Sequence, residues 1–274
     1  MAKWNWGSLL LFEAIVCIVS LLLSIAATVA PQIVLTVPAR VGFSVGPKTV
    51  LLLLSSTAPG AVLFVLCREC RSATFTLRAS IGVYAKAILL GFVLPFSSYL
   101  GGKIAYPLWD SSTLPSLARV FVINLLLSPL WEEITWRAYF YQKVNSMMRR
   151  GPSIVISALG FAVWHMGLMF FLYHSGVRAT ILPIYAIQLF LAGIILCSFF
   201  TLGRNSLLPC VLLHTAFNAS TTVYYRKYGR VNDTGSYVAE GIISLVVALI
   251  VFRFALRKPE DPSSAACNKA VASD

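Results

Sequence analysis

Apolar runs long enough to cross a bilayer recur along the whole chain, separated by short polar or basic stretches. A transmembrane α-helix needs about 20 predominantly apolar residues. We expect such helices at residues 8–30, 50–66, 81–100, 117–130, 153–172, 181–202, 205–223 and 237–255. The pattern therefore predicts an all-α, polytopic membrane protein, a bundle of about eight transmembrane helices.

The apolar pattern shows no internal repeat and no soluble insert, so we expect residues 1–258 to form a single transmembrane bundle. Residues 31–48 contain prolines and glycines and are predicted to form an external loop. The polar residues 259–274 are predicted to be a disordered C-terminal tail.

Composition supports a membrane protein and argues against a nucleic-acid partner. The 274 residues are 58% hydrophobic and only 12% charged, against roughly 25% charged in a typical soluble domain. The net charge of +12 comes from basic residues between apolar runs, where lipid headgroups and membrane orientation account for them. Their distribution predicts that both termini are cytoplasmic. The compact chain favours a prokaryotic cell membrane, with the endoplasmic reticulum membrane as the eukaryotic alternative.

Two adjacent glutamates and an arginine lie in the stretch 129–137, shortly after the apolar run 120–127. Ionised groups beside hydrocarbon are costly unless they are paired or solvated. On a helix, Glu133 and Arg137 are four residues apart and should form an ion pair, whereas Glu132 points about 100° away and stays available for chemistry. The alternative interpretation is a helix end stabilised by a salt bridge.

Two histidines lie within predicted spans, and each has a partner four residues away. Phe161 precedes His165, and Asn218 follows His214, so each pair shares one helix face. A carboxylate, two imidazoles and an amide in one polar intramembrane cavity would supply what amide hydrolysis needs: a base for water, a proton donor and hydrogen bonds to the oxyanion. Each histidine alone could instead be a satisfied core residue.

Three motifs on successive polar segments resemble those of the CAAX protease and bacteriocin-processing family of intramembrane endopeptidases, which includes the Ras-converting CAAX endopeptidase. They are Glu132-Glu133-x-x-x-Arg137, Phe161-x-x-x-His165 and His214-x-x-x-Asn218. The resemblance implies a peptidase that cleaves a membrane-anchored substrate, either a prenylated CAAX-type C-terminus or a peptide precursor.

The resemblance also implies a role for each motif residue. Glu132 and His165 would activate water, and His214 with Asn218 would hold the oxyanion. Supporting positions are Glu133, Arg137 and Phe161. No cofactor is then required. Zinc bound by Glu132, His165 and His214 is the mechanistic alternative, although the chain lacks an HExxH motif.

A non-catalytic role is the competing hypothesis for the whole protein. Buried polar residues can also line a transport path or fix helix packing, as in an immunity, scaffold or transport protein. The sequence shows no inverted repeat of the kind found in transporters. A single sequence does not distinguish an active peptidase from a scaffold that keeps its motifs.

Overall fold

The computed structural model describes residues 5–29, 35–36, 44–45, 47–97, 113–228 and 234–258. The predicted tail 259–274 and most of the predicted loop 31–48 lie outside these residues. The helices are α1 (Trp6–Val29), α2 (Pro47–Leu66), α3 (Arg68–Phe75), α4 (Ile81–Val93), α6 (Thr113–Leu127), α7 (Pro129–Glu133), α8 (Gln142–Met147), α9 (Arg150–Trp164), α10 (Met166–His174), α11 (Leu182–Leu202), α12 (Leu208–Tyr228) and α13 (Thr234–Arg257). A 3-10 turn, η1 (Leu94–Phe96), follows α4, and a π-helix, η2 (Ile134–Tyr141), follows α7.

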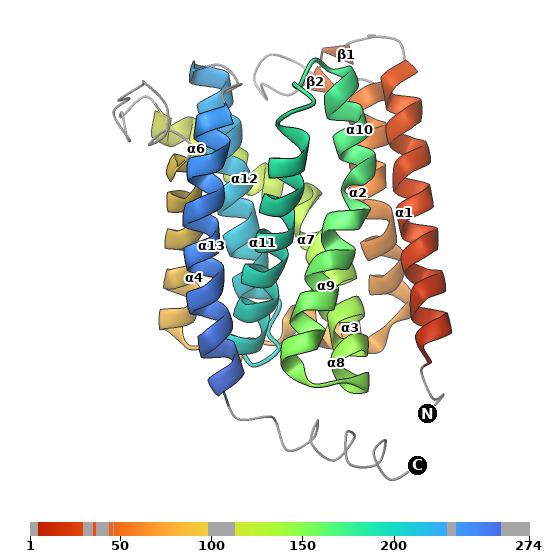
Figure 1. Ribbon diagram of the computed structural model, residues 1–274, viewed down its shortest axis with the longest axis vertical. Coiled ribbons are helices and arrows are strands. Elements are labelled where there is room, and N and C mark those ends of the chain that lie inside the picture. Colours follow the sequence, from red (N-terminus) through yellow and green to blue (C-terminus); the bar gives the residue numbers. More distant parts are fainter. Residues whose placement is uncertain are drawn as a thin grey trace.

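The long helices stand side by side as a bundle, with α7 near its centre (Figure 1). Two short strands, β1 (Leu35–Thr36) and β2 (Ser44–Val45), pair antiparallel in the loop between α1 and α2. That pairing is the one piece of β-structure among the described residues, and the predicted all-α membrane fold is confirmed.

Four helical stretches are long and apolar enough to cross a membrane: Trp6–Val29, Arg150–His174, Leu182–Leu202 and Thr234–Arg257. Within the described residues there are also two bent helix pairs, Val50–Leu66 with Arg68–Phe75 and Leu114–Leu127 with Pro129–Met147, and the number of spans is six if each pair crosses the membrane as one. Apolar side chains such as Leu10, Leu22 and Leu249 are about 60% exposed on the outside of the bundle, as expected of residues that face lipid. The protein is therefore an integral membrane protein.

Several predicted helices are interrupted, and each interruption has a local cause. The fourth predicted span bends by 42° after Leu127, because Pro129 cannot continue the hydrogen-bond ladder and begins a new helix instead. The fifth is interrupted by a turn at His165. The seventh begins at Leu208 rather than at residue 205, since Arg204 and Asn205 adopt left-handed backbone conformations with φ of 57° and 58°.

The central position of α7 depends on a close backbone contact with α2. A Cβ atom at Gly60 would lie 2.1 Å from the carbonyl oxygen of Trp131, a distance that no side chain tolerates. Glycine at this position therefore lets α2 pack directly against the helix that carries Glu132 and Glu133. All eight residues of the following π-helix η2 are buried.

Candidate active site

The two glutamates lie where α7 gives way to η2, beside a bend and a change of helix type. Glu132 and Glu133 are both buried, and the eight-residue π-helix begins at Ile134. π-Helical turns are rare and occur frequently at functional sites. The break at Ser128 and the π-helix thus set these carboxylates apart from a regular transmembrane helix.

Glu133 is the centre of a buried polar network. Its Oε2 lies 3.1 Å from Nε of Arg137, and its Oε1 accepts a hydrogen bond from the same guanidinium at 3.3 Å. Both side chains are fully buried, so the predicted ion pair is confirmed. Glu133 Oε1 also lies 2.8 Å from Nδ1 of His214, a contact that the sequence did not reveal.

This contact fixes the orientation of the His214 ring. An ionised carboxylate only accepts hydrogen bonds, so Nδ1 of His214 must carry hydrogen and donate it to Glu133. The other ring nitrogen, Nε2, then lies 3.8 Å from Oε2 of Glu132. The other carboxylate oxygen of Glu132, Oε1, accepts a hydrogen bond from the hydroxyl of Ser128.

His165 is oriented by the backbone of its own helix. Its Nδ1 lies 2.8 Å from the carbonyl oxygen of Phe161, and because a carbonyl accepts, this nitrogen is the donor. Nε2 of the neutral ring is then left as an acceptor. The ring stacks edge-on against Phe161 and Trp164, with centroid distances of 4.4 and 4.5 Å.

The ring of Phe161, on α9, lies between residues of the other two motifs. The guanidinium carbon of Arg137 lies 4.4 Å from the centroid of the Phe161 ring, a cation–π arrangement. The same ring lies 6.4 Å from that of His214. The Phe161 ring therefore lies beside a residue from each of the three motifs.

One cavity of about 330 Å³ brings together all four side chains for which the sequence predicted direct chemistry. Glu132 comes from α7, His165 from the turn between α9 and α10, and His214 and Asn218 from α12. The rest of the lining is Ser20, Leu52, Leu53, Ser55, Ser56, Ser128, Trp164 and Leu168. The structure thus places the three motifs around a shared space inside the bundle.

Sequence reasoning missed the serines of this cavity. Ser128 precedes Glu132 by four residues, the same spacing that identified the other pairs, and could have been found on that ground. Ser55 and Ser56 interrupt an apolar run on α2, but nothing local indicates which helix they face.

No group of three or more histidine, cysteine, aspartate or glutamate side chains within the described ranges is arranged to hold a metal ion. Glu132, His165 and His214, the three residues of the zinc alternative, all line the 330 Å³ cavity. Cys67 and Cys70 are three residues apart in the sequence, but they make separate contacts. Cys67 Sγ lies 3.2 Å from a carboxylate oxygen of Glu69, and Cys70 is buried against the carbonyl oxygen of Ala138.

Residues 114–220 match the family model described as type II CAAX prenyl endopeptidase Rce1-like. The matched segment runs from α6 into α12 and contains all three motifs. The family resemblance predicted from the motif residues is therefore confirmed over this segment. No curated protein sequence matches the chain.

Proposed function

We propose that this protein is an intramembrane endopeptidase that hydrolyses a peptide bond in a membrane-anchored substrate. The observation that carries the proposal is the single cavity lined by Glu132, His165, His214 and Asn218. The family match over residues 114–220 supports the same class of reaction. Four polar side chains gathered inside an apolar bundle are costly for folding, and catalysis accounts for their retention.

Glu132 and His165 are the proposed water-activating pair. The carboxylate of Glu132 and Nε2 of His165 both accept hydrogen bonds, so a water between them would be oriented by two acceptors. As the water oxygen attacks the substrate carbonyl carbon, its proton passes to this pair. The C–N bond then breaks, and the proton moves on to the leaving nitrogen.

His214 and Asn218 are the proposed oxyanion donors. With its Nδ1 hydrogen bonded to Glu133, a charged His214 ring presents the hydrogen on Nε2 to the cavity, while the carboxylates of Glu132 and Glu133 offset its positive charge. The side-chain amide of Asn218 lies one helical turn further along α12 and supplies a second donor. Donors held in place at low dielectric stabilise the developing negative charge strongly.

The substrate class follows from the family description and from the membrane setting. We propose a lipid-anchored peptide, either a prenylated CAAX-type C-terminus or a peptide precursor, and an assembly in which residues 1–258 act as one catalytic bundle. We propose further that both termini are cytoplasmic and that the membrane is a prokaryotic cell membrane. The competing non-catalytic hypothesis assigns the same residues to packing alone.

Cleavage of a quenched, lipidated peptide library by the detergent-purified protein tests the proposal. Wild type and Glu132→Ala are compared, each with chelator and with added zinc. Cleavage by wild type that survives chelation and is absent in Glu132→Ala supports the glutamate mechanism. Loss on chelation with recovery on zinc addition would assign Glu132 and the histidines to a metal. Absence of cleavage by folded wild type would favour the non-catalytic hypothesis.

A further inference from the structure

A second chamber adjoins the candidate active site at its two histidines. The inner part, about 80 Å³, is lined by Phe161, His165 and His214 together with residues of α11 and α13. The outer part, about 190 Å³, lies among α10, α11, α12 and α13. Five residues line both parts: Gln188, Leu189, Ala192, Phe217 and Glu240. The two parts therefore adjoin, and together they are here called the second chamber.

The second chamber leads toward one end of the bundle. Its outer lining includes Leu172 near the end of α10, Val177 in the connection to α11, and Tyr237 near the start of α13. These segments lie at the top of the bundle in Figure 1, whereas the C-terminal end of α13 lies at the bottom. The second chamber thus extends from the two histidines toward this end of the bundle.

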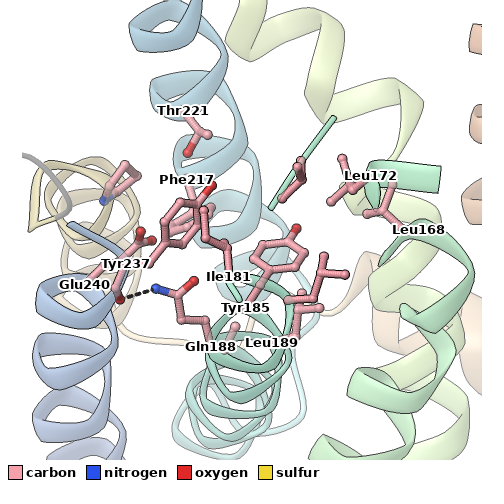
Figure 2. Close-up of a pocket in the computed structure, with 14 residues that line it drawn as sticks. Leu168, Leu172, Ile181, Tyr185, Gln188, Leu189, Phe217, Thr221, Tyr237 and Glu240 are labelled. Carbon is pink, nitrogen blue, oxygen red and sulfur yellow. Dashed lines mark hydrogen bonds between the residues drawn. The ribbon is translucent and has the colours of Figure 1, made fainter. Parts of the chain in front are cut away.

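The walls of the second chamber are apolar except for a few groups, of which Gln188 and Glu240 border both parts. Figure 2 shows the Gln188 amide pointing to the backbone of α13, where its Nε2 donates to the carbonyl oxygen of Tyr237 at 2.8 Å. This bond leaves the Gln188 oxygen as an acceptor. Among the described residues, no cationic side chain forms an ion pair with the carboxylate of Glu240.

The chemistry of the proposed reaction supplies a matching partner. When water adds to the carbonyl carbon and the C–N bond breaks, the leaving nitrogen takes a proton and becomes a primary amine, which is mostly protonated at neutral pH. A carboxylate within a membrane bundle is costly without a cation or donor beside it. An ammonium group with three hydrogens satisfies both Glu240 and the free Gln188 oxygen, whereas a hydrocarbon chain would leave them unpaired.

We propose that the second chamber binds the amine-bearing fragment released by peptide hydrolysis, with Glu240 and Gln188 as acceptors for its new amino group. The proposal rests on the proposed function and adds to it a direction for the substrate. The carboxyl-side fragment leaves by way of the second chamber, between α11 and α13. The anchored part of the substrate remains in the cavity beside α2 and α7.

Binding of a product-like probe tests this without requiring turnover. The probes are the tripeptide Ala-Leu-Leu amide with a free amino terminus and its N-acetyl counterpart, titrated calorimetrically into the detergent-solubilised full chain. Wild type should bind the free amine at least about tenfold more tightly, as expected for one charge-assisted hydrogen bond. Glu240→Gln should bring the two affinities close together.

Glu13→Gln is the matched control, because Glu13 is also a carboxylate within a membrane helix but borders neither the cavity nor the second chamber. It should keep the wild-type preference for the amine. Ala192→Leu narrows the second chamber from a position that borders both of its parts, and should weaken binding of both probes without touching a charge.

Equal affinity of wild type for the two probes, binding of neither, or an unchanged preference in Glu240→Gln would overturn the proposal. Peptide cleavage is measured on the same preparations and reports separately on the proposed function. If the protein cleaves peptide but shows no preference for the free amine, the proposed role of the second chamber is wrong and the proposed peptidase function stands.

Discussion

His214 donates a hydrogen bond from Nδ1 to Oε1 of Glu133 at 2.8 Å, across 81 positions of sequence. The contact joins the second glutamate of the first motif to the histidine of the third. It gives Glu133 two tasks, neutralising Arg137 and aiming Nε2 of His214 toward Glu132. The two adjacent glutamates therefore have different surroundings, because Glu133 contacts Arg137 and His214 whereas Glu132 lines the cavity.

Arg137→Ala should destabilise the fold. The substitution leaves Glu133 as a buried carboxylate without its ion-pair partner, and breaking a buried pair costs about 3–5 kcal/mol. Thermal unfolding in detergent measures the effect. The double variant Glu133→Gln with Arg137→Met removes both charges and should recover part of the lost stability, but not activity, since His214 loses its carboxylate acceptor. A melting temperature for Arg137→Ala equal to that of wild type would contradict this account of the network.

Ser128→Ala should lower kcat by about tenfold with little change in KM. Ser128 donates to Oε1 of Glu132, so its loss frees the carboxylate to rotate away from the water. Ser128→Thr keeps a hydroxyl and should restore most of the activity, which a purely structural role would not predict. A fall in folded yield with unchanged kcat would assign Ser128 to the helix break instead.

Asn218→Ala should reduce the cleavage rate by about 10²- to 10³-fold, the effect expected from removing one oxyanion donor. Its melting temperature should stay close to that of wild type, because Asn218 borders a cavity rather than filling the packed core. His174→Ala serves as the control. His174 ends α10, with its ring bonded to the Phe170 carbonyl oxygen, outside the cavity lining. Wild-type activity in Asn218→Ala would remove the oxyanion assignment.

Gly60→Ala should destabilise the protein by about 1–3 kcal/mol, the usual range for overpacking. The added methyl group meets the Trp131 carbonyl oxygen at 2.1 Å and pushes α7, with both glutamates, away from α2. Gly241→Ala is the matched control on α13, where nothing lies within 4 Å of the added atom. That change should be neutral or stabilise by about 0.4–1 kcal/mol. Equal melting temperatures for the two variants would argue against tight packing at Gly60.

The sequence predicted those features of the site that depend on local spacing. Glu133 and Arg137, Phe161 and His165, and His214 and Asn218 are each four residues apart, and helix geometry alone places each pair on one face. The membrane-protein class also followed from apolar segment length. Both inferences concern single helices, in which residue spacing and segment length follow from helix geometry alone.

Contacts between distant helices were not predictable in the same way. Nothing in the spacing shows that Glu133, rather than Glu132, holds His214, or that Gly60 lies against Trp131. The turn at His165 was also missed, since His165 lies within a continuous apolar run that is long enough for one unbroken helix. Glu240 went unnoticed because it is a single carboxylate near the start of an ordinary apolar helix.

The measurement that tests the account most directly is the cleavage rate of Glu132→Gln beside wild type on the same membrane-anchored peptide. The substitution keeps the size of the side chain and removes its ability to take a proton from water. We predict a loss of about 10²- to 10⁴-fold, the range for a general base, with an unchanged melting temperature. Cleavage within a few-fold of wild type by a folded Glu132→Gln protein would contradict the claim that Glu132 activates water.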